Sequence, residues 1–205
     1  MSTDSPPANS IAPTPDAPSG KKKSDKAERR RGMETMFRVT YRNHIALSQL
    51  ADQKAGILIS INGLIISVII AVLTPRLGAW SSALLPSVVL VGGCFASLTF
   101  AIVASRPRID RTPVTVDDVR NNQGNLLFFG HFLNMPLGDF QAAVRALGKD
   151  RKLLQDSMSR QLYAMGGALL TKYRYLHFAY VSFLVGIGVA AALFAALLVG
   201  AAFAS

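Results

Sequence analysis

The sequence predicts an all-α membrane protein with three transmembrane helices. The first and last of them continue into long cytoplasmic helices, which accompany a small cytoplasmic helical domain. The chain of 205 residues carries a net charge of +10, yet 50% of its residues are hydrophobic. The two kinds of residue are segregated, because residues 55–73, 84–104 and 178–203 contain no charged side chain. Each of these runs is long enough to cross a hydrocarbon core of about 30 Å as a helix.

Residues 1–32 are predicted to form a disordered, basic N-terminal tail. Residues 1–20 are rich in Pro, Ser, Ala and Asp and lack aromatic side chains, so they can bury little apolar surface. Residues 21–31, KKKSDKAERRR, contain seven Lys or Arg, which favours cytoplasmic retention beside a span and contact with anionic lipid. Nucleic-acid binding is the less favoured alternative, because no module that reads or stacks bases follows.

Residues 33–54 are predicted to form an amphipathic cytoplasmic helix that continues into transmembrane helix 1, residues 55–73. Apolar side chains recur at helical spacing at Phe37, Tyr41 and Ile45. No proline lies between the charged and the apolar part. The two parts are therefore expected to form one unbroken helix.

Transmembrane helix 1 is expected to end at Thr74-Pro75, because the residue before a proline disfavours the helical conformation. Trp80 in the following loop suits the membrane–water interface. Residues 84–104 are predicted to form transmembrane helix 2, which leads into the basic sequence SRPRIDR.

Residues 105–177 are predicted to be a cytoplasmic sensor region. Its first part, up to residue 123, is expected to be a loop in which Asp117 and Asp118 are solvated or cap a helix. Residues 124–135, GNLLFFGHFLNM, are expected to form a short strand or a buried apolar turn.

The rest of the sensor region is predicted to be helical. Residues 136–147 begin with a proline, which the first turn of a helix tolerates. Asp150 is expected to cap a new helix. Residues 151–177 carry an apolar stripe of helical period that leads directly into transmembrane helix 3, residues 178–203.

The distribution of Lys and Arg predicts how the spans are oriented. Residues 1–54 contain ten of them, the loop between the first two spans contains Arg76, residues 105–177 contain eleven, and none follows the third span. The positive-inside rule then places the N-terminus and the sensor region in the cytoplasm, and the C-terminus outside.

The chain shows no pattern that is typical of an enzyme, a metal site or an ion relay. It contains no Walker-type loop, no nucleophile elbow and no paired-histidine helix. His44, His131 and His177 are isolated in the sequence, and the spans carry no ionisable relay group. The one cysteine, Cys94, excludes an intramolecular disulfide and is not expected to be reactive in its apolar run. Neither catalysis nor a cofactor is therefore expected.

Basic and aromatic residues of the cytoplasmic segments can form a pocket for a small anionic ligand with a planar base. Arginine makes bidentate contacts to phosphate, and aromatic rings stack on bases. Contact with lipid headgroups is an equally good interpretation for any single charged residue. Lys172 and Phe129 are further candidates for this pocket. The candidate ligand-binding residues are Arg38, Arg42, Asn43, Lys54, Asn125, Phe128, His131, Tyr173 and Arg174.

Asn62 is the only strongly polar side chain in the sequence of the three predicted spans, and Gly63 follows it. An amide in hydrocarbon needs a partner, which a neighbouring helix can supply. Asn62 and Gly63 are therefore predicted to serve helix packing within or between chains, with a pore-lining role as the alternative. Glycine pairs in the other two spans, at 92–93 and at 186 and 188, allow helix backbones to approach closely.

Three segments of the chain are similar to one known family. They are YRNHIALSQLADQKAGILISINGLIISVIIAVL at residues 41–73, NLLFFGHF at residues 125–132, and YAMGGALLTKYRYLHFAYVSFLVGIG at residues 163–188. The first resembles the core of the Pycsar transmembrane effector family, the second a middle loop and the third the final helix. The resemblance extends over residues 35–200.

The resemblance implies a bacterial anti-phage defence effector in the inner membrane. A companion cyclase makes cUMP or cCMP on infection, the effector senses this ligand through its cytoplasmic region, and impairment of the membrane leads to abortive infection. The expected partners are the lipid bilayer, the cyclic pyrimidine nucleotide and further copies of the chain, since three spans alone cannot line a wide pore. No nucleic-acid partner is expected.

Two other functions are compatible with the residues alone. A small channel or transporter subunit, or a membrane-anchored scaffold, would need no nucleotide sensing. Two-span effectors of cyclic oligonucleotide systems also resemble this architecture, so a cyclic oligonucleotide is the alternative ligand class.

Overall fold

The computed structural model describes residues 19–76, 82–107 and 112–204, and over these ranges it contains helices and no strand. A 3₁₀ turn, Thr74–Arg76, follows the first helix directly, as Thr74-Pro75 predicted. The chain divides into two units, Met1–Val39 and Thr40–Ser205. The helices are α1 (Ser19–Leu73), α2 (Leu84–Ser105), α3 (Val116–Arg120), α4 (Phe129–Phe132), α5 (Leu137–Lys149) and α6 (Arg151–Ala204).

Helices α1, α2 and α6 are each long and apolar enough to cross a membrane, which confirms the predicted all-α class with three candidate spans. Helices α1 and α6 contain 55 and 54 residues without a break. The expected continuity between the polar and the apolar part of each helix is therefore confirmed.

The beginning of α1 differs from the sequence-based expectation. The helix starts at Ser19, so residues 19–32 are helical, although they were expected to belong to a disordered tail. Lys, Arg, Glu and Ala are good helix formers, and Asp25 and Arg29 have the spacing of a favourable pair on one helix face. Side chains 24–32 are exposed, so local propensity supports this helix without a core. Residues 1–18 and Trp80 lie outside the described residues.

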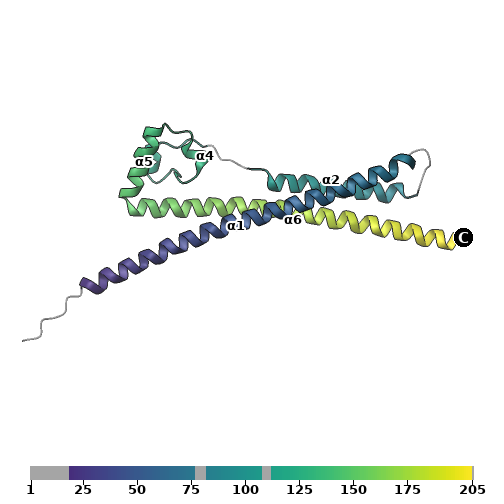
Figure 1. Ribbon diagram of the computed structural model, residues 1–205, viewed down its shortest axis with the longest axis horizontal. Coiled ribbons are helices and arrows are strands. Elements are labelled where there is room, and N and C mark those ends of the chain that lie inside the picture. The colour runs from purple at the N-terminus through teal and green to yellow at the C-terminus, as the bar shows by residue number, and fades with distance from the viewer. Residues whose placement is uncertain (1–18, 77–81, 108–111, 205) are drawn as a thin grey trace, which may run out of the picture. The chain divides into compact units, whose positions relative to one another are not determined.

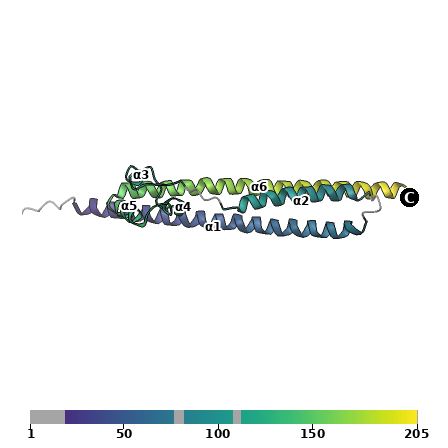
Figure 2. The same cartoon turned by 90° about the horizontal axis from the view of Figure 1, so that it is seen from above.

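Helix α2 lies alongside α6 in both views of the second unit (Figures 1 and 2). Gly93 of α2 and Gly186 of α6 are in backbone contact between these helices. A Cβ atom built on Gly93 would lie 2.6 Å from the Cα atom of Gly186. The predicted close approach of backbones at the glycines of these two spans is confirmed at this pair.

Small side chains also connect α1 to α2 and α6. Ala51 and Ala55 of α1 form a buried cluster with Ala104 and Leu176. One turn further along α1, Leu58 packs with Ala101 and Ala179. Alanine lets the helices approach closely, so the three apolar helices of the second unit form one packed bundle.

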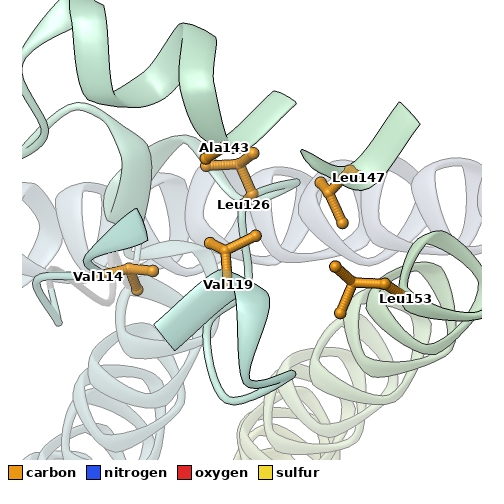
Figure 3. Close-up of a cluster of buried hydrophobic side chains, with 6 residues drawn as sticks. All are labelled: Val114, Val119, Leu126, Ala143, Leu147 and Leu153. Carbon is orange, nitrogen blue, oxygen red and sulfur yellow. The ribbon is translucent and has the colours of Figure 1, made fainter. Parts of the chain in front are cut away.

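A separate small core is formed by the segment between α2 and α6 together with the first turns of α6. Figure 3 shows its six buried side chains, Val114, Val119, Leu126, Ala143, Leu147 and Leu153. Gly124 is required here, because a Cβ atom at this position would overlap the side chain of Val114. The polar segment expected to be a sensor region therefore has a core of its own.

Two local expectations for this segment are corrected. The stretch expected to be a loop contains α3, whose N-cap Thr115 forms a capping box with Asp118. For the stretch 124–135 the expected strand is wrong, whereas the alternative of a buried apolar turn is confirmed in part, because turns at 126–127 and 133–134, with Leu126 buried, flank the short helix α4. The cap that holds α3 is a local side-chain arrangement that hydrophobic periodicity does not reveal.

The helix cap predicted at Asp150 is confirmed. Its carboxylate accepts hydrogen bonds from the backbone N–H groups of Lys152, at 2.9 Å, and Leu153, at 3.2 Å. Asp150 thereby ends α5 and starts α6, so the small core is attached rigidly to the helix that continues into the third span.

Candidate functional site

A pocket of about 310 Å³ lies between α1, the C-terminal end of α2 and the polar part of α6. Its volume is at the lower end of the range for small-molecule sites. We call it the interhelical pocket. It is lined by His44, Ile45, Ser48, Gln49, Val103, Ala104, Arg106, Pro107, Met165, Ala168, Leu169, Thr171, Lys172 and Tyr175.

Lys172 is a charged residue of the interhelical pocket that contacts two side chains of α1. Its Nζ atom lies 2.8 Å from Oδ1 of Asp52 and donates a hydrogen bond of 2.9 Å to Oγ of Ser48. The next residue, Tyr173, donates from its hydroxyl group to the backbone carbonyl of Leu47 at 3.3 Å. Three polar contacts therefore join α6 to one stretch of α1 beside the pocket.

His44 supplies a polar atom whose hydrogen-bonding capacity is unused. Its Nδ1 atom is buried and has no hydrogen-bond partner among the described residues. A buried polar atom without a partner is costly, and a bound ligand or water can satisfy it. The imidazole is thus a candidate for contact with a molecule in the interhelical pocket.

The lining as a whole combines two cations with apolar walls. Arg106 and Lys172 provide positive charge, Tyr175 and His44 provide planar rings, and aliphatic side chains such as Leu169 complete the walls. A compact anion attached to a planar group matches this combination, because cations bind the anion and rings stack on the plane. No group of His, Cys, Asp and Glu that could hold a metal ion occurs in the described part of the chain.

The structure brings three of the predicted ligand residues together, but away from the interhelical pocket. Asn125, Phe128 and His131 lie in the small domain, where the backbone carbonyl of Asn125 is 3.2 Å from Nδ1 of His131. The rings of Phe128 and His131 meet edge-on at 5.2 Å. The Asn125 carboxamide donates to Oε1 of Gln161 and accepts from the N–H of Leu127. These contacts hold the segment around α4 together and attach it to Gln161 of α6.

The other predicted ligand residues are spread along the two long helices. Arg42, Asn43 and Lys54 are exposed on α1, and Arg38 is exposed in the first unit. Arg174 is exposed on α6 with its guanidinium 5.9 Å from the ring centroid of Tyr175, while Tyr173 contacts α1 as described. None of these nine residues belongs to the lining of the interhelical pocket, whereas the further candidate Lys172 does.

The sequence contains helical spacings that place several of the pocket residues on the same face of their helix. His44 and Ser48 are four residues apart on α1, and Ala168, Lys172 and Tyr175 are spaced four and three apart on α6. Such spacings place side chains on one helix face. Arg42, Asn43 and Arg174 are exposed and do not belong to the lining, so they lie outside the helix faces that form the pocket.

Asn62 is fully buried, at 0% exposure, in the packed part of the three long helices. Its Nδ2 atom donates to Oγ of Ser97 on α2 at 2.9 Å and to the carbonyl of Leu58 one turn earlier at 2.8 Å. Its Oδ1 atom is buried without a partner among the described residues. Asn62 thus forms a polar contact between α1 and α2 in an otherwise apolar region, whereas a Cβ atom on Gly63 would contact nothing within 4 Å.

Comparison with known proteins gives one result. The family model of the Pycsar effector protein domain matches residues 35–200. No curated protein and no solved structure matches the chain at a significant level. The matched range includes the apolar parts of all three long helices, the interhelical pocket and the small domain. The chain therefore belongs to the Pycsar effector family, and it is a multi-pass membrane protein of anti-phage defence.

Proposed function

We propose that this effector senses a cyclic pyrimidine mononucleotide, cUMP or cCMP, in the interhelical pocket, and that binding impairs the integrity of the bacterial inner membrane. The infected cell then stops growing before phage replication is complete. The nucleotide acts as a ligand and is not turned over. The observation that carries the proposal is the position of a cationic, ring-lined pocket where α1, α2 and α6 meet.

The cations of the pocket suit the single phosphate of such a ligand. Lys172 is partly buried, and its present counter-ion is the more exposed carboxylate of Asp52. A cyclic phosphate that enters the pocket can take over this role, with Arg106 as a second contact. The unpaired Nδ1 atom of His44 is available to the base, and the ring of Tyr175 forms part of the wall beside it.

The place of the pocket provides a route from ligand to membrane. Its walls belong to helices that continue without a break into the apolar segments. A ligand that separates or tilts the polar parts of α1 and α6 moves the attached spans as well, provided that it binds one arrangement better than the other. The positive-inside rule favours a cytoplasmic position for the pocket, which is the side where a cyclase product is released.

The proposal is tested by calorimetric titration of the purified protein with cUMP and cCMP, with cAMP and a cyclic dinucleotide as comparisons. We expect Lys172→Ala and Arg106→Ala to weaken binding strongly. Arg42→Ala is the matched control, since Arg42 is an exposed arginine of α1 outside the pocket. Loss of binding in Arg42→Ala with full binding in Lys172→Ala would move the site away from the pocket.

A dye assay in liposomes separates gated from ungated activity. Depolarisation that follows addition of the nucleotide supports an effector, and chromatography of the nucleotide afterwards should show it unchanged. Constant ion flux without nucleotide would instead support a channel or transporter subunit. A protein that binds no cyclic pyrimidine nucleotide at micromolar concentration would overturn the ligand assignment.

A further inference from the structure

The face of α6 that points away from α1 and α2 carries a seven-residue repeat of large apolar side chains. The repeat consists of Tyr163, Leu170, Leu184 and Leu198, with His177 and Ala191 at the two intermediate positions. Leu170 and Leu184 are each two residues, or about 200°, from the inward-facing Lys172 and Gly186. We call this face the outer stripe of α6.

The outer stripe is uncovered in the isolated chain. Tyr163 is 86% exposed, Leu170 73%, Leu184 66% and Leu198 72%. Small residues follow three of the four large ones four positions later, namely Gly167, Gly188 and Ala202, whereas Arg174 follows Leu170. Large and small side chains in alternation allow a second helix to pack closely along the same face.

Lipid can cover only part of the outer stripe. The apolar span of α6 begins at Phe178, so Leu170 lies about 12 Å and Tyr163 about 22 Å before it along the helix. The polar headgroup region adds only about 5–8 Å on each side of the hydrocarbon core. Tyr163 therefore lies in water unless protein covers it, whereas Leu184 and Leu198 lie within the membrane.

We propose that the outer stripe is the surface through which copies of this chain associate, with α6 packed in parallel against α6 of a second copy. All copies insert into the membrane in one orientation, so their α6 helices run parallel. A parallel pair brings each stripe against itself in register, with Tyr163 opposite Tyr163 and Leu170 opposite Leu170. The seven-residue spacing then produces a left-handed coiled coil that continues from water into the membrane.

The second copy is favoured over an unrelated partner by the continuity of the stripe. One repeat crosses two environments on a single helix, and a partner helix must cross the same two environments at the same heights. A second copy of α6 fulfils this condition, because its polar and apolar parts have the same lengths. The association does not depend on the nucleotide, so it can hold even if the proposed ligand is wrong.

Cysteine cross-linking in native membranes tests the proposal in a Cys94→Ala background, which removes the only cysteine. We expect Leu170→Cys and Leu184→Cys to give cross-linked dimers under mild oxidation. Ala168→Cys is the control in the polar part, because Ala168 is exposed but lies on the pocket side of α6. Ala179→Cys is the control in the span, because Ala179 is buried against α1 and α2.

A disruptive variant distinguishes specific association through the outer stripe from cross-linking by random collision. Tyr163→Glu combined with Leu170→Glu should strongly reduce the cross-link formed by Leu184→Cys, because it places charge opposite charge along the water-exposed part of the pair. Circular dichroism checks that the helices persist. Equal cross-linking at Ala168→Cys, an undiminished cross-link in the Glu variant, or a product with the mass of a foreign protein would each overturn the proposal.

Discussion

Lys172 of α6 and Asp52 of α1 form an ion pair with an Nζ–Oδ1 distance of 2.8 Å at the edge of the interhelical pocket. The two residues are far apart in the sequence, and each lies a short distance before an apolar span. The pair therefore joins the polar parts of the two helices that continue into the membrane. Its lysine faces the pocket, so a bound anion and Asp52 compete for the same cation.

Reversing one charge of this pair should weaken the contact between α1 and α6, and reversing both should restore it. We expect a coupling free energy of about 0.2–1 kcal/mol between Asp52→Lys and Lys172→Asp, because the pair is partly exposed to solvent. Denaturant unfolding of the two single variants and the double variant measures it. Asp139→Lys, at an exposed position of α5, is the control. A coupling energy of zero would show that the ion pair does not stabilise the bundle.

Gly186→Ala should force α2 and α6 apart, because the new Cβ atom would lie 2.8 Å from the Cα atom of Gly93. We expect a loss of about 1–3 kcal/mol in unfolding free energy, as for an overpacked core. Gly188→Ala is the matched control, since its Cβ atom would meet nothing within 4 Å. Thermal unfolding in one detergent compares the two. Equal melting temperatures for both variants would contradict the close contact.

Asn62→Ala should destabilise the packing of α1 on α2, because it removes the hydrogen bond to Ser97. An interhelical hydrogen bond in a membrane contributes about 0.6–2 kcal/mol. Ser97→Ala combined with Asn62→Ala should cost little more than Asn62→Ala alone, since both remove one interaction. Unfolding in mixed micelles gives these values. If Asn62→Ala leaves stability unchanged but alters ion conductance in liposomes, the pore-lining alternative is favoured instead.

Gly56→Pro tests whether α1 transmits ligand binding to the membrane as one rigid helix. Proline within a helix removes a backbone hydrogen bond and kinks the chain, at a cost of about 3 kcal/mol. Gly56 is exposed, and a Cβ atom there would meet nothing within 4 Å, so the substitution alters continuity more than packing.

We expect the Gly56→Pro variant to bind the nucleotide normally in calorimetry and to lose nucleotide-dependent depolarisation. Gly56→Ala keeps the helix continuous and should retain both properties. Depolarisation at the wild-type level in the proline variant would refute the rigid-helix transmission.

The half of the α3 capping box that the Asp118 carboxylate forms should be lost at acidic pH. The pKa of Asp118 is lowered from its ordinary value of 3.8 by a hydrogen bond from the Thr115 hydroxyl and by a second from the Thr115 backbone N–H. A lowered pKa in the folded state means that the carboxylate stabilises the fold fully above pH 3.8, and that this stabilisation disappears as the pH falls through the lowered pKa.

An NMR titration of the Asp118 carboxyl group measures this directly. Thr115→Ala removes the hydroxyl donor, so the pKa of Asp118 should return toward its ordinary value. An Asp118 titration that is identical in wild type and Thr115→Ala would contradict the assigned cause.

Several features of this protein could be predicted from local sequence because their physical causes are local. Whether a helix can cross a membrane depends on its own length and polarity, and the cap at Asp150 depends on the three residues after it. The unbroken helix through Lys54 and Ala55 follows from the absence of a breaker. The helical start at Ser19 was missed because a polar, basic composition was interpreted as disorder although its helix propensity is high.

The interhelical pocket could not be predicted, because it depends on which faces of three helices meet. A helix turns by about 100° per residue, so two residues that are two positions apart, such as Arg42 and His44, lie on nearly opposite faces. The same holds for Arg174 and Lys172. That choice is made by the contact of Gly93 with Gly186 and by the alanines of α1, which fix how the helices approach. The sequence by itself determined the three long helices that can span a membrane, and the family. The tertiary structure alone decided which polar side chains share a pocket, because packing between distant segments selects the faces.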